Sequence, residues 1–203
     1  MPPVVRRGVI AFSLAFLLLG GALVFDYWWA GPDSGTAPTG LPFKIGGPFT
    51  LTDQNGVERH AADFRGKLML VYFGYAFCPD ACPTTLLAIS NALKDLGSDA
   101  DKVQPIFITV DPARDTVKEL KLYSTNFSPR ILMLTGPPAA TAAAAKEYRV
   151  FYEKVPQPGG GKDDYLVNHT SLVYLMSRTG RFLTDFAPGF TPKQMANGIK
   201  RFF

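Results

Sequence analysis

The pattern of apolar and polar positions from residue 49 onward predicts alternating strands and helices. Three continuous apolar runs have the length of strands that are buried on both faces of a sheet. These runs are residues 67–77, 103–112 and 130–136. Helical spacing, a capping box or a leading proline predicts helices between and after them. The predicted helices are residues 84–97, 117–127, 137–150 and 191–203.

Shorter strands are predicted at both ends of this series. Asn55-Gly56, the strongest short hairpin signal, divides residues 49–60 into two strand-like pieces. Further strands are predicted at residues 150–155, 170–177 and 181–188, and residues 156–165 form a long mobile loop. The last two strands pair through the turn at Arg178-Thr179-Gly180.

This order of elements predicts an α/β fold. Strands that alternate with helices form a mostly parallel sheet with helices on both faces. The hairpin at the start and the antiparallel pair at the end make the sheet mixed. The two cysteines follow the first central strand directly, so they are expected at the carboxyl end of the strands, where open α/β sheets place their sites.

The N-terminal part of the chain has a different pattern. Residues Gly8–Phe25 contain no charge, which is nearly enough apolar helix to cross the hydrocarbon core, and an aromatic cluster follows. Arg6 and Arg7 precede the run, so the positive-inside rule leaves the N-terminus in the cytoplasm. A cleaved signal peptide and a buried core helix are alternatives, but no convincing A-x-A cleavage site follows and every face of the run is apolar.

These features predict four segments. Residues 1–7 form a cytoplasmic tail, 8–29 a transmembrane anchor, 30–47 a Gly/Pro-rich linker and 48–203 the folded domain. No Arg-rich, Ser-rich transit peptide precedes the span, which favours a bacterial inner membrane with a single pass and the domain in the periplasm. The net charge is +4, without basic runs interleaved with aromatics, so nucleic-acid binding has no support.

Cys78 and Cys82 are the only cysteines of the chain, and three residues separate them. A structural disulfide is one alternative, but closing so small a loop contributes little stability. Proline fits the first position of a helix, so Pro83 predicts that Cys82 is the N-cap and that Cys78 lies in the preceding turn. The positive end of the helix dipole then favours a thiolate, which could act as a nucleophile or a metal ligand.

A third ligand has to come from elsewhere in the chain. Of the two histidines, His60 lies in a polar stretch and is expected at the surface, whereas His169 stands where the mobile loop meets a strand. Two thiolates with one imidazole suit Cu(I), and hold Cu(II) with a further ligand. Zinc normally takes a fourth protein ligand, or a water in a catalytic site.

Three segments together resemble the SCO/SenC family of copper proteins. They are "GYAFCPDACPTTL", "VDPARDT" and "DDYLVNHTSLVYL", in that order. The resemblance implies a membrane-anchored, three-layer thioredoxin-like fold with copper ligands Cys78, Cys82 and His169. It also implies that Asp111 lies near the site behind the ligands, although Asp111 could equally be a turn residue before its proline. Arg114 and Asp115 are expected to cap or pair around the next helix start.

The chain departs from the family pattern at two places. Asn168 stands where the family commonly has an aspartate beside the histidine, which removes a negative charge and could weaken Cu(II) relative to Cu(I). No proline directly precedes His169, so the substrate clamp of thioredoxins is not intact, which counts against efficient general disulfide exchange.

Two functions from different classes follow. The first, which the resemblance implies, is a copper metallochaperone that helps assemble the CuA centre on cytochrome c oxidase subunit II and is supplied by a periplasmic copper donor; this is not strictly an enzyme. The second is a thiol–disulfide oxidoreductase, in which Cys78 and Cys82 are a redox-active pair that keeps the CuA cysteines or other periplasmic thiols reduced. A peroxiredoxin-like peroxidase is discounted because no threonine precedes Cys78 at the required position.

Overall fold

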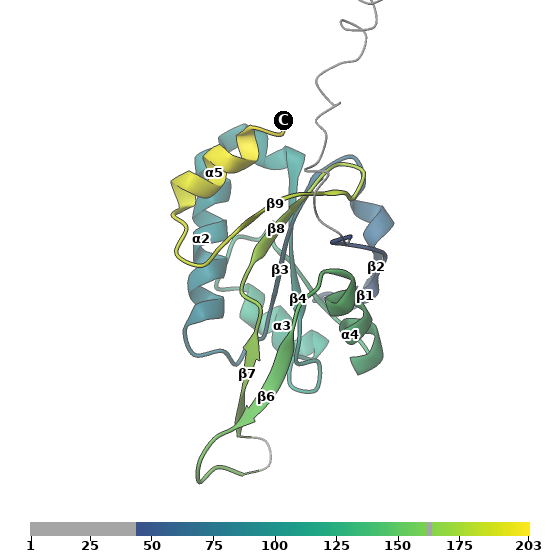
Figure 1. Ribbon diagram of the computed structural model, residues 1–203, viewed down its shortest axis with the longest axis vertical. Coiled ribbons are helices and arrows are strands. Elements are labelled where there is room, and N and C mark those ends of the chain that lie inside the picture. The colour runs from purple at the N-terminus through teal and green to yellow at the C-terminus, as the bar shows by residue number, and fades with distance from the viewer. Residues whose placement is uncertain (1–43, 162–163) are drawn as a thin grey trace, which may run out of the picture. The chain divides into compact units, whose positions relative to one another are not determined.

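In the computed structural model, which describes residues 44–161 and 164–203, a seven-stranded mixed sheet forms the centre of the domain (Figure 1). Its central strands run parallel, and every other pairing in it is antiparallel. The strands, in order across the sheet, are β2 (Glu58–His60), β1 (Thr50–Asp53), β5 (Leu132–Thr135), β4 (Val103–Thr109), β3 (Leu68–Gly74), β8 (Val173–Met176) and β9 (Phe182–Phe186).

Helices cover both faces of this sheet. They are α2 (Ala81–Leu96), α3 (Val117–Ser124), α4 (Pro138–Glu147) and α5 (Pro192–Lys200), with short 3₁₀ helices η1 (Ala61–Phe64) and η2 (Gly97–Lys102). Neighbouring residues of β3 point to opposite faces. Tyr72 packs through Phe107 towards Tyr123 of α3, whereas the ring of Phe73 lies 5.3 Å from that of Tyr148, which follows α4. The three layers and the mixed sheet confirm the predicted α/β architecture.

Local sequence signals set several element boundaries as predicted. Asn55 and Gly56 form the turn of the β1–β2 hairpin, where Gly56 has a φ of +83°. Helix α3 begins after Thr116, whose hydroxyl accepts the backbone N–H of Glu119 at 3.3 Å. Helix α2 ends at Gly97, whose φ of +60° is a conformation that glycine adopts without the steric cost of a side chain.

One strand was missed. Residues 165–169 form β7 (Tyr165–His169), which pairs only with β6 (Tyr152–Pro156) within the described chain, as a separate antiparallel hairpin. The beginning of this stretch was predicted to be a mobile loop, because the glycines and prolines before it signal irregular structure. Tyr165 and Val167 are buried and alternate with more exposed neighbours, so a period of two was the available signal. In Figure 1 the hairpin extends away from the rest of the domain.

The described chain begins within the expected linker. Ile45 already packs against the core, and the backbone N–H of Gly46 donates to the carbonyl of Glu147 at 2.8 Å. The expected tail and transmembrane anchor, residues 1–29, lie outside the described residues. Within residues 44–161 and 164–203, no helix is long and apolar enough to cross a membrane.

Candidate metal centre

The cysteine loop connects the carboxyl end of β3 to the start of α2. Helix α2 begins at Ala81 with Asp80 as its N-cap, so the prediction that Cys82 is the N-cap was wrong. Cys82 is the second helical residue and Pro83 the third. Proline is tolerated there because the N–H groups of the whole first turn have no acceptor within the helix. Cys78 lies before the helix, as expected.

The two sulfur atoms lie in different surroundings. Both cysteines are free thiols; Cys82 is fully buried and Cys78 is partly exposed. The backbone N–H of Cys82 donates to the Cys78 sulfur at 3.4 Å. A hydrogen bond from the Cys82 thiol, helped by backbone N–H groups, holds the pKa of Cys78 well below its usual range. The same hydrogen bond and burial raise the pKa of Cys82. Cys78 is therefore the thiolate of the pair.

His169, the last residue of β7, faces this pair. Its Nε2 lies 3.4 Å from the Cys82 Sγ, and its Nδ1 lies 3.0 Å from the Thr170 carbonyl oxygen. A carbonyl oxygen only accepts, so Nδ1 is the donor. The other ring nitrogen, Nε2, is the one directed at the Cys82 sulfur. The structure thus brings together the three residues that the sequence analysis selected.

The floor of the site is closely packed. A Cβ on Gly74 would lie 2.9 Å from both the Cys82 Sγ and a ring carbon of Phe107, so only glycine fits at the end of β3. The rings of Tyr72 and Tyr75 lie 6.1 and 6.0 Å from the His169 ring, both edge-on. Aromatic side chains therefore orient the imidazole and shield the inner sulfur from water.

The three candidate ligands lie close together but are not arranged as a complete coordination site. Within the described residues, no group of three or more His, Cys, Asp or Glu side chains is arranged to hold a metal ion. The 3.4 Å between the Cys82 Sγ and the His169 Nε2 is a hydrogen-bond distance, and it is also a separation that two ligands of one metal ion can have. A metal held by all three residues requires the Cys82 proton to leave. The donor set, two sulfurs and one imidazole nitrogen, is soft and suits copper.

Asp111, which the resemblance implied to lie near the site, contacts none of the three residues in the hydrogen bonds of the structure. It is buried, and its carboxylate accepts hydrogen bonds from Arg114 Nε at 2.5 Å and from the Tyr165 hydroxyl at 2.9 Å. Arg114 also donates to the Tyr165 carbonyl at 3.0 Å. Asp111 is thus more than a turn residue, because it joins the end of β4 to the strand that ends at His169.

Asp115 connects the cysteine loop to β4, a role that its sequence position did not indicate. It is fully buried, and its carboxylate accepts the backbone N–H of Ala76 at 3.0 Å and the Thr109 hydroxyl at 2.6 Å. It therefore holds the cysteine loop against the end of β4, while Thr116 caps the helix. Burial raises the pKa of Asp115 to about 6. A charged residue in the turn "VDPARDT" gave no signal of a bond to a loop 39 residues earlier.

His60 lies away from the site, as predicted. It is exposed on β2, where its Nδ1 lies 2.9 Å from the Thr50 hydroxyl and its Nε2 3.4 Å from a Glu58 carboxylate oxygen.

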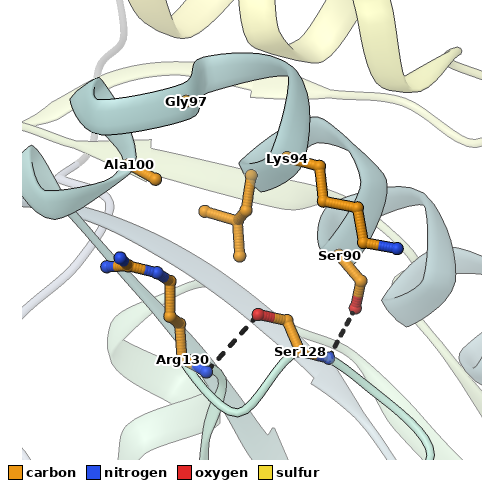
Figure 2. A pocket seen from close by; sticks show the side chains of 7 residues that line it. Ser90, Lys94, Gly97, Ala100, Ser128 and Arg130 are labelled. Atoms are coloured by element: carbon orange, nitrogen blue, oxygen red, sulfur yellow. Dashed lines mark hydrogen bonds between the residues drawn. The ribbon is translucent and has the colours of Figure 1, made fainter.

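The domain also has hollows on its surface. One lies beside the cysteine loop and is lined by Ala76, Phe77, Glu119, Leu122, Tyr123 and Asn126. Another lies by the C-terminal half of α2 (Figure 2). The Ser90 hydroxyl accepts the Ser128 backbone N–H and donates to a helix carbonyl, and Arg130 pairs with Asp101 at 2.6 Å. The Ser90 hydroxyl and the Arg130 guanidinium of this second hollow thus have partners within the protein.

Known proteins match this chain along its folded part. The sequence profile described as SCO1/SenC matches residues 37–203. An SCO2-like protein of Rickettsia prowazekii is 40% identical over 157 residues, which are 77% of this chain and 76% of that protein. The mouse SCO2 homolog, a mitochondrial protein, is 39% identical over 157 residues, which are 76% of this chain and 61% of the relative.

Solved structures agree in fold. The copper-bound structure of Bradyrhizobium japonicum ScoI superposes with a TM-score of 0.73 at 47% identity and covers 78% of this chain and 99% of that one. Copper-bound yeast Sco1 superposes with a TM-score of 0.71 at 37% identity, covering 78% of this chain and 88% of its own. The fold is thus the thioredoxin-like α/β fold that the resemblance implied. On the profile match, the relatives and the fold, this chain belongs to the SCO1/SenC family.

Proposed function

We propose that this protein is a membrane-anchored copper metallochaperone that helps to assemble the CuA centre of cytochrome c oxidase. SCO family proteins take part in copper binding and cytochrome c oxidase assembly. The observation that carries the proposal for this chain is the convergence of Cys78, Cys82 and His169, with the histidine Nε2 directed at the Cys82 sulfur at 3.4 Å. The copper-bound relatives share the fold that positions these residues.

Copper is the cargo of this site. Metal ligands must be deprotonated, so Cys78 offers a thiolate at once, whereas Cys82 has to release a proton as the ion enters. The bond from Nδ1 of His169 to the Thr170 carbonyl fixes the ring with its other nitrogen towards the sulfurs. The three ligands then give Cu(I) a soft site of low coordination number, and Cu(II) would take a further ligand.

Release to a partner uses the difference in exposure between the sulfurs. Cys82 is fully buried, whereas Cys78 is partly exposed and follows Phe77, whose side chain is half-exposed. An incoming thiolate or imidazole of subunit II can therefore approach the metal beside Cys78 while Cys82 and His169 still hold it. Stepwise exchange of ligands avoids a free ion.

The proposed location follows from the N-terminal sequence. The uncharged run Gly8–Phe25 would anchor the protein in a bacterial inner membrane by a single pass, with the domain in the periplasm. A periplasmic copper donor would supply the metal. A periplasmic thiol reductant would keep Cys78 and Cys82 reduced, because that compartment oxidises thiols.

Anaerobic titration tests the copper site. The reduced full-length protein in detergent competes with a Cu(I) chelator, alongside Cys78→Ala, Cys82→Ala and His169→Ala, with His60→Ala as the matched histidine control. We expect each ligand variant to bind copper at least about tenfold more weakly than the parent. A tenfold change corresponds to a loss of only about 1.4 kcal/mol of binding free energy for the missing ligand. His60→Ala should bind as the parent does. A His169→Ala variant that retains the parent's affinity would rule out the proposed site.

A second function is favoured by the low pKa of the partly exposed Cys78 thiolate. We propose that it can attack a partner disulfide, which breaks the partner's S–S bond and forms a mixed disulfide. Cys82 then loses its proton and attacks Cys78, so the partner leaves as a dithiol and the pair becomes a disulfide. An external thiol reductant must reset the pair. Exchange measured with a model disulfide should survive in His169→Ala, whereas copper affinity should not.

A further inference from the structure

The hairpin that carries His169 is not held by the main sheet. Within the described residues, β6 and β7 hydrogen-bond as strands only to each other. The hairpin leaves the body of the domain in Figure 1. The His169 end of the hairpin continues through residues 170–172 into β8, which pairs with β3. The main sheet does not pair with the hairpin beyond that end, so side chains must supply the constraint on its orientation over the cysteine loop.

One cluster joins the hairpin to the end of β4. The Asp111 carboxylate accepts the Tyr165 hydroxyl at 2.9 and 3.2 Å, and Arg114 donates to both the Asp111 carboxylate and the Tyr165 carbonyl. The Arg114 guanidinium also lies 3.7 Å from the centre of the Tyr165 ring. On the hairpin side, Lys154 donates to the Tyr165 hydroxyl at 3.0 Å and lies 3.7 Å from Asp111.

The character of these contacts makes them strong. Asp111 is 1% exposed and Tyr165 8%, so their hydrogen bonds are shielded from water. Bonds to an ionised carboxylate from a guanidinium are about twice as strong as neutral ones. A cation over an aromatic ring adds a further attraction when it is desolvated.

The cluster can act on the metal site through β7. Tyr165 and His169 are the first and last residues of this strand, and side chains at every second position share a face. Tyr165, Val167 and His169 therefore point to the same side, and the first two are buried. Fixing Tyr165 at one end limits where the imidazole can lie at the other, about 13 Å along the strand.

We propose that Asp111 and Arg114 clasp Tyr165 and thereby hold the histidine hairpin closed over the cysteine loop, which sets the copper affinity of the site. They are positioning residues that act through His169 and do not touch the metal. This inference rests on the proposed copper function. A hairpin that is closed for only a fraction of the time lowers the apparent affinity by that fraction.

A double-mutant cycle in the reduced full-length protein tests the clasp. Asp111→Asn and Tyr165→Phe are each measured in the parent and in the His169→Ala background, by anaerobic competition with a Cu(I) chelator. In the parent we expect each to weaken copper binding by about five- to tenfold, because the closed form becomes a minor population. With His169 already removed, the same substitution should change copper affinity by less than about twofold, because the clasp then has no imidazole to position.

The outcomes separate the two proposals. Equal losses in both backgrounds would overturn the clasp and leave the copper site intact. A parent that binds no copper, or that does not need His169, would overturn the proposed function itself. If Asp111→Asn does not fold, Tyr165→Phe decides the matter, because it removes only the hydroxyl and keeps the ring under Arg114.

A spectroscopic readout distinguishes positioning from general destabilisation. In Cu(II)-loaded protein, we expect Tyr165→Phe to weaken the nitrogen hyperfine signal of the bound imidazole in the electron paramagnetic resonance spectrum. The matched control is Asp53→Asn, since Asp53 is another buried carboxylate that pairs with an arginine, Arg59, at 2.9 Å on the β1–β2 hairpin. It should lower stability and leave copper affinity and the spectrum unchanged. A control that alters them as much as Tyr165→Phe does would overturn the clasp.

Discussion

The Nε2 of His169 and the Sγ of Cys82 lie 3.4 Å apart, although 87 positions separate the two residues in the chain. The other ring nitrogen is bound to the Thr170 carbonyl, so the histidine can turn little without losing that bond. The imidazole is thus oriented before any metal arrives.

The difference between the two thiols predicts selective alkylation. Because the pKa of Cys78 is lowered and that of Cys82 raised, iodoacetamide should modify Cys78 first. The rate at Cys78 should stay nearly constant from pH 8 to about pH 6, because a thiolate loses reactivity only as pH falls through its pKa. Mass spectrometry of quenched samples locates the label.

Cys82→Ser provides the control for this prediction. A hydroxyl is a different donor from the thiol that chiefly lowers the pKa of Cys78, so the pH profile of Cys78 should shift. Equal labelling of both cysteines in the parent would contradict the assignment of Cys78 as the thiolate.

Gly74→Ala should disturb the site from below. The new Cβ would meet the Cys82 sulfur and the Phe107 ring at 2.9 Å, and overpacking of this kind costs about 1–3 kcal/mol. Urea unfolding measures the loss. Gly161→Ala is the control, because a Cβ there meets nothing within 4 Å. If both variants are as stable as the parent, the contacts of Gly74 with the Cys82 sulfur and the Phe107 ring leave room for a methyl group, contrary to the packing described.

Asp115 predicts a dependence of stability on pH. Its pKa is near 4 in the unfolded chain and about 6 in the fold, because burial disfavours the charged form. Between pH 4 and pH 6 the folded state therefore binds more protons at Asp115 than the unfolded chain does. The stabilisation from protonated Asp115 is complete below about pH 4 and is lost as the pH rises through about 6. The full effect is of order 3 kcal/mol.

Asp115→Asn should remove that dependence, because an amide does not titrate in this range. The difference in free energy of unfolding between parent and variant is measured by denaturation at pH 4.5 and pH 7. If the difference is the same at both pH values, the carboxyl group does not titrate as described.

Asn168→Asp should favour Cu(II) relative to Cu(I), because it places a negative charge beside the ligand His169. Asn168 is exposed and neighbouring residues of a strand point to opposite faces, so we expect a change of about fivefold or less in the affinity ratio. Competition titrations with each oxidation state measure the ratio, which should shrink further in high salt. A reversed ratio would contradict the electrostatic argument.

Oxidation of the thiol pair should abolish copper binding, because both sulfurs are then tied in one bond and neither is a thiolate. Gel filtration after incubation with copper checks for bound metal, and dithiothreitol treatment should restore binding. Oxidised protein that still binds one copper would mean that the sulfurs are not the ligands.

Local signals determined most of the elements. The buried strands, the Asn55-Gly56 turn and the helix that ends at Gly97 follow from apolar runs and from backbone preferences of single residues, which act without tertiary context. The same holds for the position of Cys78 before a helix. The start of α2 was misjudged because proline fits any position of the first turn, not only the first one.

The sequence by itself determined which residues could form the site: two cysteines at close spacing, one histidine near a strand and a "VDPARDT" motif. Only the tertiary structure decided how they act together. The contacts that build the site join segments that lie 39 to 87 residues apart in the chain. They are the approach of His169 to Cys82, the bonds of Asp111 and Arg114 to Tyr165, and the bond of Asp115 to Ala76. Such contacts depend on how β3, β4 and the hairpin pack, and local patterns carry no record of that packing.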